Sequence, residues 1–175
     1  MEIERIDVSS LKEMDSNLTG EICDFFSQAA AVCLDNQNHS QGVVFKIEGD
    51  LSAQFQLFWP EVTQQMRDSW ADLAETTEDG ACCLAILIIQ KLTDYKVIRR
   101  SRKKTGFDYW LGDKESQYPF QEKARLEISG ILKGSKNKIE QRVKDKIKQT
   151  QQSNHLNLPA VVVEFGTPMS QVVKR

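Results

Sequence analysis

The sequence predicts one α/β domain, in which a mixed central sheet is flanked by helices. The chain has 175 residues, enough for a single domain with a sizeable buried core. Runs of β-branched and aromatic residues alternate with longer segments of helical periodicity. In the second half the predicted order is helix, three strands, helix and strand. A helix that crosses over between strands is typical of a mixed sheet covered on both faces.

The first 75 residues are predicted to hold two helices and a β-hairpin. These elements are a helix over 16–34, strands over 43–47 and 55–59, and a helix over about 61–74. Ser16 or Asn17 can cap the first helix, because both side chains accept hydrogen bonds from free backbone N–H groups. The turn between the two strands lies at Gly49-Asp50, a sequence that suits a tight hairpin connection.

The second half is predicted to contain a buried helix and most of the sheet. The elements are a helix from Thr76 or Thr77 to Leu92, strands over about 95–101, 106–111 and 124–131, a helix over 136–151, and a strand over 160–165. The first of these helices is apolar nearly all round, which indicates burial. The second has one apolar stripe, formed by Ile139, Val143 and Ile147. Glu164, within the last strand, is either a further acidic residue near a functional site or part of a salt bridge at a sheet edge, and we expect the salt bridge.

Two neighbouring predicted strands each carry an acidic residue where a buried strand is normally apolar. These residues are Asp108 and Glu127. Side chains alternate along 124–131, so that Arg125, Glu127 and Ser129 point to the face opposite the apolar ones. Two such carboxylates can hold a hard divalent cation, because its oxygen ligands must converge from rigid elements. Alternatively, Asp108 and Glu127 pair with Arg125 or another nearby basic residue.

The net charge of −2 conceals a strong asymmetry between the two halves of the chain. Residues 1–80 contain 16 acidic and 4 basic residues, a net charge of −12, whereas residues 81–175 contain 9 and 19, a net charge of +10. This division indicates either that the C-terminal half faces an anionic partner or that the two halves attract each other. In the second case, the acidic half of one chain can dock on the basic half of another and form a homodimer.

The cysteines and the hydropathy pattern indicate the cellular compartment of the protein. The four cysteines lack the paired spacing of a metal site and are interpreted as small core residues in a reducing compartment. The longest apolar stretch, 81–89, is too short to cross a membrane, and the N-terminus lacks a hydrophobic signal region. We therefore expect a cytoplasmic protein without a membrane partner.

The order of elements, with an acidic residue on the second and third strands of the second half, resembles the core of the PD-(D/E)XK nuclease superfamily. The resemblance covers about residues 76–166 and implies a restriction-endonuclease-like core. On this division, residues 1–75 form an N-terminal helix and hairpin elaboration, and residues 167–175 form a tail. The two segments 105–112 and 124–131 are also similar to a small bacterial family of uncharacterised proteins.

The resemblance implies a set of metal ligands and a catalytic role for each. Glu78 matches the Glu near the start of the family's core helix, Asp108 matches the strand Asp, and Glu127 matches the first residue of the Glu-x-Lys motif. These three carboxylates would bind Mg²⁺, with Mn²⁺ as a possible substitute. A glycine close to the site, Gly106, fits a close approach by a nucleic-acid backbone.

The chain departs from the family at the cation of the Glu-x-Lys motif, where it has Ser129. In some members of the superfamily this cation comes from the following helix. Arg142 and Lys146 lie one turn apart on that predicted helix, and either can reach back toward Glu127. Arg125, two residues before Glu127 on the same strand face, is another candidate. The sequence does not choose among these three.

Basic residues around the two carboxylates predict an anionic substrate, most simply DNA. The proposed nucleic-acid contacts are Arg100, Arg102, Lys103, Lys104 and Lys138. Tyr109 and Trp110 could stack on a base, although aromatic residues within a strand are more often core. The resemblance thus implies a Mg²⁺-dependent nuclease. The alternative is an inactive nuclease-like module that binds nucleic acid or a protein partner.

Overall fold

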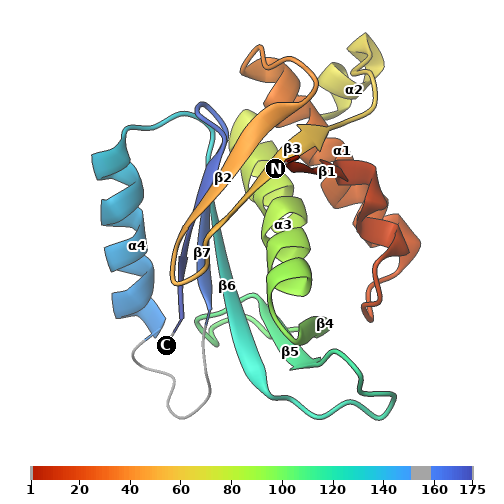
Figure 1. Cartoon of the computed structure of the whole chain (residues 1–175), viewed down its shortest axis with the longest axis vertical. Helices are drawn as coiled ribbons and strands as arrows, with labels where there is room; N and C mark the ends of the chain where they lie inside the picture. Colours follow the sequence, from red (N-terminus) through yellow and green to blue (C-terminus); the bar gives the residue numbers. More distant parts are fainter. Residues whose placement is uncertain (1, 151–158, 175) are drawn as a thin grey trace.

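The computed structural model describes residues 2–150 and 159–174, and it has an eight-stranded mixed sheet with helices on both faces (Figure 1). The strands are β1 (Glu4–Asp7), β2 (Val43–Gly49), β3 (Ala53–Phe58), β4 (Tyr95–Arg100), β5 (Tyr109–Asp113), β6 (Ala124–Ile131), β7 (Ala160–Glu164) and β8 (Met169–Val173). The helices are the 3₁₀ helix η1 (Val8–Glu13) and the α-helices α1 (Gly20–Asn36), α2 (Gln64–Ser69), α3 (Leu73–Leu92) and α4 (Lys136–Thr150). The predicted α/β class is confirmed.

The strands follow the order β1-β3-β2-β8-β7-β6-β5-β4. The β2–β3 hairpin is antiparallel, as predicted, and β2 pairs in parallel with β8. Strands β6 and β7 are parallel and are connected through α4, whereas β5 pairs with β6 in the antiparallel direction. Because β2 pairs with β8, the N-terminal strands continue the same sheet as the predicted core and share its hydrophobic interior.

The helices form layers on opposite faces of the sheet. Helix α3 packs on β6 and β7 and is covered in turn by α1, while α4 packs on β6, β7 and β8 from the other side (Figure 1). Alternation along β6 separates these layers: Gly130 faces the Thr77 carbonyl of α3, and Ser129 and Glu127 bond to side chains of α4. All eight residues of β6 are buried, so its polar residues lie between two packed layers.

Helix α3 begins earlier than predicted, at Leu73 in place of Thr76 or Thr77. The Asp72 carboxylate accepts hydrogen bonds from the N–H groups of Ala74 and Glu75, at 3.0 and 3.2 Å. An N-cap residue has extended backbone angles, so Asp72 also interrupts the chain before it. For this reason the helix predicted over 61–74 is wrong at its end: α2 covers only Gln64–Ser69.

The start of α1 also differs from the prediction of a cap at Ser16 or Asn17. Thr19 caps the helix, and its hydroxyl accepts a hydrogen bond from the Ile22 N–H. Asn17 instead bonds to β4: its backbone N–H donates to the Val97 carbonyl and its side-chain amide donates to the Ile98 carbonyl. These two bonds satisfy carbonyls along the outer edge of β4.

Several strand predictions require correction. Strands β1 and β8 were not predicted, and β8 lies within the residues expected to form a C-terminal tail. Strand β5 starts at Tyr109, so Asp108 precedes the strand. The predicted salt bridge of Glu164 at a sheet edge is wrong. Its buried carboxylate accepts hydrogen bonds from backbone N–H groups of Gly134, Gly166 and Thr167 in the middle of the sheet.

Other predictions agree with the structure within the described residues. Helix α4 spans Lys136–Thr150, and the predicted last residue, Gln151, lies outside them. Its apolar stripe packs inward through Ile139 and Val143. Cys23, Cys33 and Cys83 are buried, and all four cysteines are free thiols. In the described part of the chain, no helix is long and apolar enough to cross a membrane.

Candidate functional site

The candidate site lies where β5 stops pairing with β6. Strand β5 pairs with Ala124, Arg125 and Leu126, and β6 then continues for five more residues. On this edge the N–H of Ile128 donates to Asp108 Oδ2 at 2.7 Å, and the N–H of Gly130 donates to Glu78 Oε2 at 3.2 Å. Buried backbone N–H groups require acceptors, so the two carboxylates replace the missing strand.

The backbone on either side of Asp108 holds its carboxylate in this position. Its N–H donates to the Leu126 carbonyl, and its carbonyl accepts from the Ser101 N–H, each at 2.9 Å. The preceding loop turns at Lys104 and Gly106, which have φ values of 70° and 81°. Left-handed backbone at these two residues turns the chain sharply, so that Asp108 faces β6 directly before the start of β5.

Glu127 lies beside Asp108 and forms an ion pair with Lys146. The Lys146 Nζ is 2.5 Å from Glu127 Oε1, and the Glu127 side chain is only 6% exposed. Burial, followed by repulsion from Asp108, raises the pKa of Glu127 to about 7, against the opposing effect of Lys146. Burial also raises the pKa of Asp108, against the hydrogen bond from Ile128. The site therefore concentrates two carboxyl groups that resist simultaneous ionisation.

Helix α4 supplies the cations that the strand lacks. Lys146 contacts Glu127, while the Arg142 guanidinium donates to Ser129 Oγ at 2.7 Å and lies 4.0 Å from Glu78 Oε1. The two residues are four apart, so both project from one side of the helix. The third sequence candidate, Arg125, places its guanidinium 5.6 Å from the centre of the Phe107 ring. Of the three, Lys146 makes the direct contact with Glu127.

A cavity of about 340 Å³ opens onto this pair of carboxyl groups. Four of the predicted nucleic-acid contacts line it together with Asp108, Glu127 and Lys146: Arg100, Arg102, Lys103 and Lys104. Lys138 does not line this cavity. It lies in the first turn of α4, eight residues from Lys146 and therefore about 12 Å away along the helix axis. The structure thus brings the basic loop, but not Lys138, to the carboxylates.

Several residues of the cavity were not singled out in the sequence. Ser101, Phe107 and Gln149 line it. Their position follows from the loop before β5 and the last turn of α4 meeting above β6, and no local pattern predicts that meeting. Tyr109, one of the two aromatic candidates for base stacking, is buried in the core. Trp110 packs edge-on against Phe107, with ring centres 4.8 Å apart.

The predicted set of three metal-binding carboxylates does not form. Among the described residues, no group of three or more His, Cys, Asp and Glu side chains is arranged to hold a metal ion. Glu78 bonds to Gly130 and approaches Arg142, whereas Asp108 and Glu127 are in side-chain contact. Mg²⁺ commonly binds through one or two carboxylates and keeps several waters. The pair Asp108 and Glu127 therefore fits such an ion, with Glu78 outside its direct ligands.

Comparison of this chain with protein-family models, with curated proteins and with solved structures found no match.

Proposed function

We propose that this protein is a metal-dependent phosphodiesterase that cleaves nucleic acid, in the manner of the PD-(D/E)XK nucleases. One observation carries the proposal: Asp108, Glu127 and Lys146 meet in a cavity that is also lined by Arg100, at the end of β4, and by three basic residues of the loop that follows it. The combination matches the chemistry of phosphodiester hydrolysis, because acidic groups hold a divalent cation and basic groups bind phosphates. The free, mostly buried cysteines are consistent with our inference of a reducing, cytoplasmic compartment.

Each side chain has a role that follows from its position. Asp108 and Glu127 would hold Mg²⁺ or Mn²⁺, and a bound divalent cation polarises a phosphoryl oxygen and lowers the pKa of its water. Lys146, in contact with Glu127, is placed to stabilise charge that develops on the phosphoryl group. Arg142 orients Ser129 and Glu78 from the same helix. The loop residues Arg102 and Lys103 would bind neighbouring phosphates of the substrate.

Cleavage assays test this proposal directly. Purified protein is incubated with plasmid DNA, single-stranded DNA and RNA, with Mg²⁺ or Mn²⁺ and with EDTA. We expect metal-dependent cleavage that is lost in Asp108→Ala and in Glu127→Ala. The matched control is Asp113→Ala, at the exposed far end of β5, which should cleave like the wild type. Equal cleavage by all four proteins would show a contaminating nuclease and refute the proposal.

A second candidate function is that of an inactive module that binds nucleic acid. The observation that favours it is the Lys146–Glu127 ion pair, which neutralises one of the two carboxylates without a metal. In this case affinity for DNA falls steeply with salt, and the slope decreases when Arg102 and Lys103 are replaced with Ala. Binding of this kind, together with no cleavage under any metal condition, would favour the second candidate over the first.

A further inference from the structure

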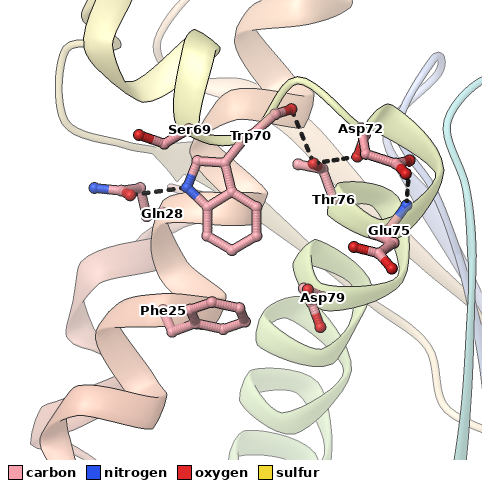
Figure 2. A pocket seen from close by; sticks show the side chains of 8 residues that line it. All are labelled: Phe25, Gln28, Ser69, Trp70, Asp72, Glu75, Thr76 and Asp79. Carbon is pink, nitrogen blue, oxygen red and sulfur yellow. Dashed lines mark hydrogen bonds between the residues drawn. The ribbon is translucent and has the colours of Figure 1, made fainter.

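A second pocket lies on the α3 side of the sheet and has the opposite charge. It occupies about 340 Å³ between α1, α3 and the segment that joins α2 to α3. Figure 2 shows the rings of Phe25 and Trp70 on one side and the carboxylates of Glu75 and Asp79 across from them. With Asp72, these residues form what we call the acidic aromatic patch. It contains none of the residues assigned above to the phosphodiesterase site.

The aromatic part of this patch exposes large apolar side chains to solvent. Phe25 is 48% exposed, and Ile22, three residues earlier on α1, is 41% exposed. The Phe25 and Trp70 ring centres are 4.7 Å apart, and the Trp70 indole N–H is held by Gln28 at 2.8 Å. Two aromatic rings in contact, one of them held by a hydrogen bond, beside acidic residues have the composition of a protein interface centre with a polar rim.

The acidic part of the patch is electrostatically unfavourable in the isolated chain. Glu75 and Asp79 lie one helical turn apart, a spacing at which like charges repel. Burial, followed by this repulsion, raises the pKa of Asp79, while Arg100 opposes the shift. Within the described residues, neither carboxylate lies within ion-pair distance of a basic side chain. A cation placed between the rings and these carboxylates would relieve the repulsion and gain cation–π contact.

The chain itself carries a segment with the complementary chemistry. Arg102, Lys103 and Lys104 are exposed at the turn of the loop before β5. Arg100, the last residue of β4 before this loop, opposes the rise in the pKa of Asp79, so basic charge next to the loop already acts on the patch of its own chain. In a dimer with twofold symmetry, each copy would present this loop to the other's patch at once. The opposite net charges of the two halves, −12 and +10, act in the same direction.

We propose that the acidic aromatic patch binds the Arg102–Lys104 loop of a second copy of this chain. In this contact, a guanidinium or ammonium group enters between the aromatic rings and the carboxylates of Glu75 and Asp79. The proposal does not depend on the phosphodiesterase activity. Because the same loop lines the cavity at Asp108, self-association and nucleic-acid binding compete for it.

Charge-reversal variants test this contact. The acid-reversed variant carries Glu75→Lys and Asp79→Lys, and the base-reversed variant carries Arg102→Glu and Lys103→Glu. The control carries Glu13→Lys and Glu61→Lys, two exposed acidic residues outside the patch. Molar mass is measured by sedimentation equilibrium over a range of concentrations, in about 50 mM and about 500 mM NaCl. Thermal melts establish that each variant is folded.

We expect the wild type and the control to self-associate at low salt and to dissociate at high salt. Each reversed variant alone should weaken association by about 100-fold or more, because like charges then meet. An equimolar mixture of the two reversed variants should associate again, because each supplies the charge that the other lacks. A wild type that stays monomeric at low salt refutes the proposal. So does a mixture of folded variants that fails to associate.

Discussion

The variant Asp108→Asn distinguishes between two interpretations of the carboxylates, a strained metal site and a structural ion pair. In the folded protein the pKa of Glu127 is about 7, compared with its ordinary value of 4.5. One pKa unit corresponds to about 1.4 kcal/mol, so ionising Glu127 in the folded protein costs on the order of 3 kcal/mol. Burial is the larger cause and Asp108 the second, so we assign about 1 kcal/mol of this cost to Asp108.

The sign of the effect follows from linkage between protonation and folding. A carboxyl group whose pKa is raised by folding destabilises the protein only where it must ionise. For Glu127 the cost is absent below about pH 4.5, grows up to about pH 7 and stays constant above it. Asn at position 108 keeps an oxygen that can accept the Ile128 N–H but carries no charge. The variant should therefore be more stable than the wild type at pH 8 and equal to it near pH 4.

Thermal melts with and without Mg²⁺ measure both consequences. A gain of about 1 kcal/mol corresponds to an increase in Tm of about 2–4 °C for a domain of this size. The wild type should gain about 2.7 kcal/mol at a Mg²⁺ concentration 100 times its Kd, and Asp108→Asn should gain little. Asp113→Asn is the matched control and should behave like the wild type. A destabilised Asp108→Asn protein, together with a wild type that does not respond to Mg²⁺, would refute the metal site.

Three further substitutions test individual parts of the structure. Lys146→Met removes the partner of Glu127 and should lower the free energy of unfolding by about 1–3 kcal/mol at pH 8, and by less at pH 4.5. It should also reduce metal-dependent cleavage by about 10²–10³-fold. Lys144→Met, at an exposed position of the same helix, is the control in melts and cleavage assays. Gly130→Ala would bring a Cβ within 2.5 Å of the Thr77 carbonyl oxygen, so chemical denaturation should show a loss of about 1–3 kcal/mol, whereas Gly20→Ala, with no atom near its Cβ, should not be destabilised. Asp72→Ala removes the cap of α3 and should cost about 0.5–2 kcal/mol in the same assay, most of which Asp72→Ser should restore.

The sequence by itself determined the elements whose patterns are local. Helix α3 is apolar nearly all round, and β6 alternates, so the type of each element follows from periodicity within it. The same reasoning placed Asp108 and Glu127 near each other, because residues at adjoining ends of paired strands are neighbours. It did not find β1 or β8, which bury few side chains and depend on pairing with β3, β2 and β7 for their strand structure.

Only the tertiary structure decided which groups the carboxylates contact. Glu78 and Asp108 are 30 residues apart, yet both accept N–H groups from one edge of β6, because β5 begins only opposite Leu126 and leaves those groups without a strand partner. The choice of Lys146 over Arg142 and Arg125 depends on how α4 crosses between β6 and β7. These contacts join segments that are distant in the chain, so packing between layers determines them, and local periodicity contains no information about that packing.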